Sequence, residues 1–333
     1  MKKFLGFLAV GALTVSLLSG CASSNLKDGT YVGTSGADDR GSYGVVTVTV
    51  KSGKISDVAF DEINGSNGQP KTAENYTYEQ AITAISSLPA KLKETKDVTK
   101  VDTVTGATGT TDKFKAAANS ALAQADKNYK AVLRDGTYTL KSGLDSHGYY
   151  SVLTATIASN QFSNVTYEEY NSENVAKKDA GYKYTEALAA IEQLPAKMNE
   201  TKDLTKVDNI TGATSSSNTF KSMMQMALDL AAARDGVYNY ETQPDDHGYK
   251  IVAKLALNNG KIVGFDYAEV NAEGKSKVDP AAGYTWEQAL TFLSRDHLKQ
   301  VVATQYGVDM VTGATGSLTN VETALKALVQ MAK

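Results

Sequence analysis

The sequence predicts an α+β protein made of three tandem copies of a small domain, each with an antiparallel sheet and two main helices. Two segments recur along the chain and support this prediction: Asp-Gly-x-Tyr and Asp-x-x-Thr-Gly-Ala-Thr. The first of them begins at Asp28, Asp135 and Asp235. These spacings are too long for solenoid units of about 20–50 residues, so each repeat should be a whole domain.

The repeated segments also predict the domain boundaries. We call the expected domains repeats 1, 2 and 3, and they span residues 28–130, 131–231 and 232–333. Very few residues separate the last helix expected in repeat 2 from the Asp-Gly-x-Tyr segment of repeat 3, as the run Ala231 to Arg234 shows. We therefore expect the domains to lie close together.

Each repeat begins with a pattern typical of a β-hairpin. Apolar residues alternate in repeat 1 at Val46, Val48 and Val50, which indicates a strand with one buried face. Short turns rich in Gly, Asn and Ser follow, and such turns join antiparallel strands. We expect these turns at Ser52-Gly53, Ser159-Asn160 and Asn259-Gly260.

Two amphipathic helices should follow each hairpin. The first has an apolar stripe in repeat 1 at Ile82, Ile85 and Leu88, and the second has one in repeat 2 that includes Phe220 and Met224. Both stripes have helical spacing. The second helix comes directly after the Thr-Gly-Ala-Thr segment.

Local signals suggest where the first helix begins and ends. A capping box, in which Thr and Gln three residues apart satisfy free backbone N–H groups, is expected at Thr77–Gln80 and Thr285–Gln288. Proline disrupts helical hydrogen bonding, so Pro89 and Pro195 should stop or bend this helix.

The composition excludes several classes of function. The 333 residues are 42% hydrophobic and 21% charged with a net charge of −3, which is typical of a soluble domain and not of a nucleic-acid-binding one. Cys21 is the single cysteine, and the three histidines lie in separate segments. Neither a disulfide, a cysteine-ligated cluster nor a familiar zinc motif fits. Redox chemistry would need an organic cofactor.

The N-terminus is typical of a bacterial lipoprotein. Lys2 and Lys3 precede the apolar stretch 4–18, which is too short for a transmembrane helix and suits a signal peptide. The stretch ends in Leu-Ser-Gly-Cys, so we expect a signal peptide at 1–20, a lipidated Cys21 and a tether at 21–27. The alternative is an ordinary cleaved signal peptide. Lipidation would place the mature chain on the outer face of the cytoplasmic membrane.

The Thr-Gly-Ala-Thr segment has properties that suit a phosphate group. It lies in a glycine-containing turn before a helix, where free N–H groups and the positive end of the helix dipole favour anions. Its last threonine offers a hydroxyl that can be esterified. The alternative is that the threonine only caps the helix.

The full pattern, which ends in Thr or Ser two residues after the last threonine, resembles the flavinylation motif of the FMN-binding domain family. That family includes subunits of sodium-pumping and Rnf-type complexes and surface lipoproteins of Gram-positive extracellular electron transfer. The resemblance covers 28–333, although repeat 3 diverges before its motif. It implies that a separate flavin transferase moves FMN from FAD onto the last threonine through a phosphoester.

The resemblance assigns a role to each position of the motif, in up to three copies. The attachment sites would be Thr108, Thr214 and Thr315. The first threonines, which would shape the turn, are Thr105, Thr211 and Thr312. The intervening residues are Gly106, Gly212 and Gly313, with Ala107, Ala213 and Ala314. The aspartates, which would assist attachment or simply cap the turn, are Asp102, Asp208 and Asp309.

Two further sets of aligned residues are candidates for contact with the flavin. Aromatic faces stack on flat rings, and equivalent aromatics occur at Tyr78, Tyr184 and Trp286; ordinary core packing is the alternative. Arg40, His147 and His247 are also equivalent and could donate to a reduced flavin, or be plain loop residues.

The function we expect is an exported, lipid-anchored electron carrier. A membrane dehydrogenase or quinone-linked donor would supply electrons, and an extracellular metal, quinone or reductase would accept them. The chain lacks a nucleophile elbow and a dinucleotide fingerprint, which favours a carrier over an enzyme with its own substrate. The alternatives are a non-redox surface lipoprotein or ligand-binding repeat protein, and a flavin-dependent reductase of a small acceptor.

Overall fold

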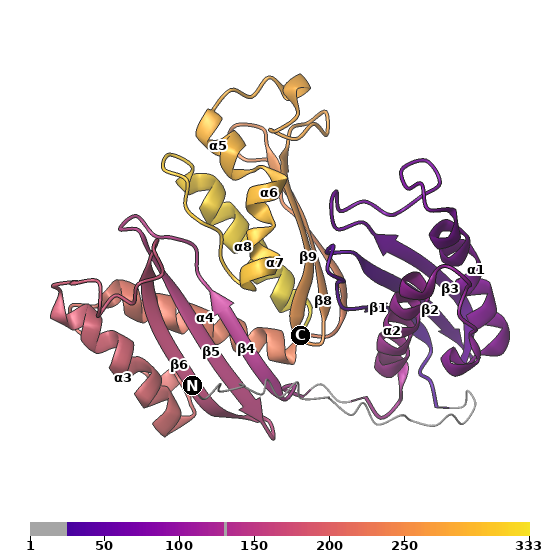
Figure 1. Ribbon diagram of the computed structural model, residues 1–333, viewed down its shortest axis with the longest axis horizontal. Coiled ribbons are helices and arrows are strands. Elements are labelled where there is room, and N and C mark those ends of the chain that lie inside the picture. Colours follow the sequence, from indigo (N-terminus) through magenta and orange to yellow (C-terminus); the bar gives the residue numbers. More distant parts are fainter. Residues whose placement is uncertain (1–24, 130–131) are drawn as a thin grey trace, which may run out of the picture.

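The computed structural model describes residues 25–129 and 132–333 and is a mixed α+β structure (Figure 1). It contains three three-stranded antiparallel sheets, in each of which the strands follow their order in the sequence. The expected α+β class is therefore confirmed. The expected signal peptide and Cys21 lie outside the described residues. Within the described ranges, no helix is long and apolar enough to cross a membrane.

Repeats 1 and 2 contain the same elements in the same order. Those of repeat 1 are β1 (Gly29–Thr34), β2 (Tyr43–Lys51), β3 (Lys54–Ile63), α1 (Glu79–Thr95), η1 (Val98–Lys100) and α2 (Thr108–Ala125). Those of repeat 2 are β4 (Gly136–Lys141), β5 (Tyr149–Ala158), β6 (Gln161–Asn171), α3 (Thr185–Thr201), η2 (Leu204–Lys206) and α4 (Thr214–Ala232).

Repeat 3 has the same sheet and last helix but a different middle. Its elements are β7 (Gly236–Glu241), β8 (Lys250–Asn258), β9 (Lys261–Val270), η3 (Pro280–Ala282), α5 (Glu287–Phe292), α6 (Arg295–Leu298), α7 (Gln300–Thr304) and α8 (Thr315–Met331). Three short helices replace the single first helix of the other repeats. Ser294 begins a new helix here because its side chain accepts a hydrogen bond from the backbone N–H of His297.

The three hairpin turns lie where the sequence predicts them. In repeat 1, Lys51 pairs with Lys54, and the two turn residues, Ser52 and Gly53, have φ of 51° and 70°. Positive φ at both positions is the geometry of the tight turn that matches strand twist. The aspartate of the Asp-Gly-x-Tyr segment holds this turn, because the carboxylate of Asp28 accepts hydrogen bonds from both N–H groups at 2.9 and 2.8 Å. That segment therefore has a structural role.

The predicted capping boxes and the predicted stop of the first helix at its proline are wrong. Tyr78 and Trp286 are the N-caps of α1 and α5, and neither helix start has a side-chain cap, so the predicted capping boxes do not form. Pro89 and Pro195 lie inside α1 and α3, which continue to Thr95 and Thr201. The prolines therefore do not end these helices.

The repeats are packed in an order that differs from the order of the chain. Figure 1 shows repeat 3 between repeats 2 and 1. Repeats 2 and 3 share one hydrophobic core, whereas repeat 1 has its own. A small apolar cluster joins repeat 1 to repeat 3 and consists of Tyr43, Ile63, Ala256 and Val263. Repeat 3 thus packs against both of the other repeats.

Candidate functional site

Each Thr-Gly-Ala-Thr segment forms a turn that leads into the last helix of its repeat. The helices α2, α4 and α8 begin at Thr108, Thr214 and Thr315. The motif glycines have φ of 78°, 82° and 88°, a region that glycine occupies without strain. The side chains of all three terminal threonines are exposed.

The three helix N-termini lack a side-chain cap. Ala107, Ala213 and Ala314 occupy the N-cap position and supply no side-chain hydrogen bond. Alanine is a poor N-cap, and its presence in place of Ser or Thr typically costs about 0.5–2 kcal/mol. The last threonine of each motif is the first helical residue, so it is not the cap that the alternative interpretation required. The free N–H groups and helix dipole leave each N-terminus ready for an anion.

The hydroxyl groups that hold the turn were not singled out from the sequence. Thr111 Oγ1 donates to the Ala107 carbonyl at 3.0 Å and accepts from the Val104 N–H at 3.2 Å. Ser217 makes the equivalent bonds in repeat 2 at 2.8 and 3.0 Å. By contrast, the side chains of the first motif threonines form no hydrogen bond within the described residues: Thr105, Thr211 and Thr312.

The aligned aromatic residues lie against the motif turn, as N-caps of α1, α3 and α5. The Tyr78 hydroxyl donates to the Gly106 carbonyl at 2.6 Å, and Trp286 Nε1 donates to the Gly313 carbonyl at 3.2 Å. Tyr184 is 48% exposed and Trp286 is 56% exposed. These rings are therefore not core aromatics. The polar atoms of Tyr78 and Trp286 are fixed by hydrogen bonds, while much of each of the three rings remains exposed.

A buried ion pair beside each motif was missed by sequence reasoning. Glutamates from β3, β6 and β9 meet lysines that follow eight or nine positions later, and this recurrence was the available signal. The pairs are Lys71–Glu62 at 2.7 Å, Lys177–Glu169 at 2.5 Å and Lys277–Glu269 at 2.5 Å. Every one of these side chains is at most 10% exposed.

Tyrosine rings cover the lysine of each pair. The Lys71 ammonium lies 4.3 Å from the centre of the Tyr76 ring. Lys177 lies 4.7 and 4.4 Å from the rings of Tyr149 and Tyr182, and the same arrangement occurs in repeat 3. Cation–π contact helps to stabilise a partly desolvated ammonium group. Each site thus contains a lysine–glutamate ion pair whose ammonium group lies against aromatic faces.

In repeat 1 these residues line a cavity of about 720 Å³, within the usual range for small-molecule sites. Arg40, Glu62, Tyr78 and Thr108 are among its lining residues. Glu62 is fully buried, and its Oε2 atom has no hydrogen-bond partner in the described part of the chain. Buried polar atoms are normally paired, so this atom is available to a donor on a ligand.

Lys113 adds a second cation to the repeat 1 cavity. It lies 2.8 Å from Asp38 and 3.3 Å from Glu62. Burial opposes ionisation of Glu62, but the hydrogen bond from Lys71, the nearby Thr110 hydroxyl and the charges of Lys113 and Lys71 outweigh it and lower the pKa of Glu62. Burial also opposes the charged form of Lys113, yet Asp38 and Glu62 raise its pKa.

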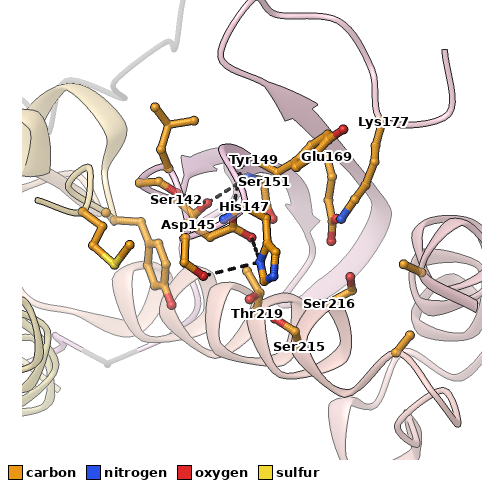
Figure 2. A pocket seen from close by; sticks show the side chains of 18 of the residues that line it. Ser142, Asp145, His147, Tyr149, Ser151, Glu169, Lys177, Ser215, Ser216 and Thr219 are labelled. Carbon is orange, nitrogen blue, oxygen red and sulfur yellow. Dashed lines mark hydrogen bonds and ion pairs between the residues drawn. The ribbon is translucent and has the colours of Figure 1, made fainter. Parts of the chain in front are cut away.

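The equivalent cavity in repeat 2 has a volume of about 410 Å³. Figure 2 shows His147 in its middle, with Glu169 and Lys177 on one side and Ser216 and Thr219 on the helix α4 below. Arg40 and His147 thus both line cavities, as their alignment suggested. Thr214 lies between Ala213 and Ser215, two lining residues.

The motif aspartates are not in equivalent positions. Asp102 and Asp208 are exposed, and their side chains form no hydrogen bond or ion pair within the described residues. Asp309 is half-buried, and its carboxylate accepts a hydrogen bond from the Leu144 N–H of repeat 2 at 3.0 Å. Among the described residues, no group of three or more His, Cys, Asp or Glu side chains could hold a metal ion.

Comparison with known proteins assigns the family. No curated protein matches the chain. A crystal structure of the CPE2226 protein from Clostridium perfringens is 31% identical, with 30% of this chain and 89% of that chain covered and a TM-score of 0.27. The family model described as the FMN-binding domain matches residues 41–123 and 148–229, which lie in repeats 1 and 2. Through these two tandem segments, the chain belongs to the FMN-binding domain family.

Proposed function

We propose that this protein is an exported, lipid-anchored electron carrier that holds FMN as a phosphoester on Thr108, Thr214 and Thr315. The observation that carries the proposal is the uncapped start of α2, α4 and α8, with an exposed threonine as the first helical residue in every case. For repeat 3, which the family model does not match, the proposal rests on this shared geometry.

The site residues fit FMN at both of its ends. The free N–H groups and helix dipole would receive the phosphate, and the exposed threonine hydroxyl at the same helix start would form the phosphoester. In that reaction the hydroxyl loses its proton and forms a bond to the FMN phosphorus of FAD, and AMP leaves. Ribityl hydroxyls and a ring N–H of FMN can donate to a buried acceptor, such as the unpaired Oε2 of Glu62.

The protein would hold the ring and tune its charge. FMN, when bound, accepts one or two electrons and can join donors and acceptors of different kinds. Tyr78, Tyr184 and Trp286 would provide aromatic faces, and the lysine of each buried pair would favour added negative charge nearby. Covalent attachment keeps the cofactor at high effective concentration in a protein that is exported.

The proposed location rests on the N-terminal sequence, and the proposed partners rest on the family resemblance. Lipidation of Cys21 would hold the protein at the outer face of the cytoplasmic membrane, and two acyl chains suffice for stable anchoring. A flavin transferase would load the threonines. A membrane dehydrogenase or quinone-linked donor would reduce the flavins, and an extracellular metal, quinone or reductase would oxidise them.

The electron-carrier role can be tested in cells that lack the native protein. Cells producing the parent protein should reduce an external ferric or quinone acceptor, and purified protein should be yellow. The triple variant T108A/T214A/T315A should be folded and colourless and should not support that reduction. Equal reduction by both strains would show that the proposed role is mistaken.

A further inference from the structure

The cavity of repeat 2 is bounded partly by repeat 3. Besides residues of repeat 2, it is lined by Tyr306, Gly307, Val308, Met310, Leu318 and Glu322. The faint yellow ribbon of repeat 3 borders the left side of the cavity in Figure 2. Among the described residues, the cavity of repeat 1 is lined only by positions between Asp38 and Lys113. The two equivalent cavities therefore differ in what covers them.

Backbone hydrogen bonds fix this contact between the repeats. The Gly307 N–H donates to the Lys141 carbonyl at 3.1 Å, and the Met310 N–H donates to the Leu144 carbonyl at 3.3 Å. The carboxylate of Asp309 accepts from the Leu144 N–H in return. The segment before the motif of repeat 3 thus pairs with the loop that borders the repeat 2 cavity.

Two glycines allow the backbones to approach so closely. A Cβ atom on Gly143 would lie 1.7 Å from the Val308 carbonyl oxygen, and one on Gly307 would lie 2.5 Å from the Gly143 nitrogen. Neither distance is sterically possible. The positions equivalent to Gly307 are Lys100 and Lys206, so only repeat 3 has a glycine with which to make this contact.

A half-buried tyrosine contributes to the same contact. Tyr306 lies in the wall of the repeat 2 cavity and interacts with Ser222 on α4. Burial, followed by the nearby charge of Glu322, raises the pKa of Tyr306 to about 12. This tyrosine is therefore neutral at physiological pH, and its ring is held between the repeats.

We propose that repeat 3 forms the outer wall of the flavin site of repeat 2, so that FMN on Thr214 lies in a composite pocket against Met310 and Glu322. This inference rests on the proposed attachment of FMN to Thr214. Flavin on Thr108, in contrast, faces solution in the cavity of repeat 1 alone. The composite pocket shields one flavin and places it beside the segment that leads to Thr315.

The shielding can be measured with FMN on one threonine at a time. In T108A/T315A protein, iodide should quench the fluorescence of FMN on Thr214 weakly, and adding Gly143→Ala should increase the quenching constant severalfold. The matched control is Gly36→Ala in T214A/T315A protein, with FMN on Thr108. The nearest neighbour of a Cβ on Gly36 is 3.9 Å away, so this change should leave quenching as it was.

A second variant, Glu322→Gln, tests the composite pocket even if Gly143→Ala disturbs folding. Glu322→Gln removes a negative charge from the wall and should raise the midpoint potential of FMN on Thr214. A tenfold change in a two-electron equilibrium corresponds to about 30 mV, and we expect a shift of up to that size. The same substitution should not change the potential of FMN on Thr108.

The outcomes separate this inference from the proposed function. Intact mass reports whether Thr214 carries FMN; a protein without it overturns the proposed function and this inference together. Two results with FMN-loaded protein would together overturn the composite pocket alone. Glu322→Gln would leave the midpoint potential of FMN on Thr214 unchanged, and folded Gly143→Ala protein would be quenched by iodide like its parent.

Discussion

Repeats 1 and 2 build equivalent cavities around a buried glutamate but compensate its charge differently. In repeat 2, the Tyr167 hydroxyl donates to Glu169 at 2.8 Å, in addition to the lysine of the pair. Repeat 1 has Phe60 at the position of this tyrosine and uses Lys113 to contact Glu62. Both repeats therefore contain a buried glutamate whose charge is balanced by neighbouring side chains. The identity of those side chains sets the charge of the cavity.

The same comparison extends to the rest of the two cavities. Repeat 1 has Arg40 and Lys113 where repeat 2 has His147 and Thr219. Repeat 1 thus combines more positive charge with an open cavity, whereas repeat 2 combines fewer cations with a wall from repeat 3. Two domains of one chain can in this way give the same cofactor different potentials and different access.

The largest expected effect is a difference in the free energy of unfolding between variants that break the ion pair of repeat 2 and the ion pair of repeat 1. Lys177→Met would leave Glu169 without a cation, and breaking a buried pair in this way costs about 3–5 kcal/mol. Lys71→Met should cost less, because Lys113 remains 3.3 Å from Glu62. Denaturant-dependent hydrogen exchange of β5 and β2 measures the two losses separately. Equal losses would show that Lys113 does not replace the missing cation.

The next largest expected effect is on the midpoint potentials of the two flavins. Lys113→Thr gives repeat 1 the residue of repeat 2 and should lower the midpoint potential of FMN on Thr108, because a cation that stabilises the reduced form is lost. Thr219→Lys should raise the potential of FMN on Thr214. Each shift should be about 30 mV, a tenfold change for two electrons, in redox titrations of singly loaded protein. Shifts in the same direction would contradict the comparison.

Acid should reveal the charge compensation in repeat 1. The lowered pKa of Glu62 means that its contribution to stability is present above the ordinary carboxyl pKa of about 4. This contribution is lost as pH falls through the lower pKa of the folded state. Lys113→Thr should raise that folded pKa and move the loss to higher pH. Near-ultraviolet circular dichroism over about pH 2–5 tests this, and identical acid transitions would refute it.

The smallest effect concerns the turn hydroxyls. Thr111→Ala and Ser217→Ala should each destabilise their repeat by about 1 kcal/mol, the usual value of one hydrogen bond. Repeat 3 has Leu318 at this position, so its turn lacks the hydroxyl, and the matched Leu318→Ala should leave the exchange of the Val311 N–H unchanged. Hydrogen exchange at Val104 and Ile210 should increase in the first two variants.

The sequence predicts the elements of repeats 1 and 2 because the signals are local. Alternation at Val46 to Val50 gives β2, and the turn at Ser52 and Gly53 requires only neighbouring residues. Tyr78 was placed at the start of a helix by alignment, and it lies beside the motif glycine. The sequence showed that repeat 3 diverges before its motif, but it did not predict that the first helix is divided into three. Nothing in the sequence distinguishes Ser294 as the N-cap of a new helix.

Features that depend on contacts between distant residues were not predicted from the sequence. The pairing of Glu62 with Lys71 forms only when β3 and the following loop lie against each other, and the recurring spacing of the two residues was its signal in the sequence. The contact of Gly143 with Val308 joins two repeats and leaves no periodic signal. Repeat 3 lies between the other repeats because of such contacts, and the order of the chain does not reveal this arrangement.

The central claim is covalent FMN on the terminal threonine of each motif, and intact mass tests it most directly. Full-length protein produced with a flavin transferase should carry three FMN adducts, and peptide mapping should place them on Thr108, Thr214 and Thr315. Each single Thr→Ala variant should lose one adduct. A protein without adducts, or one whose adduct count is unchanged in these variants, would contradict the account.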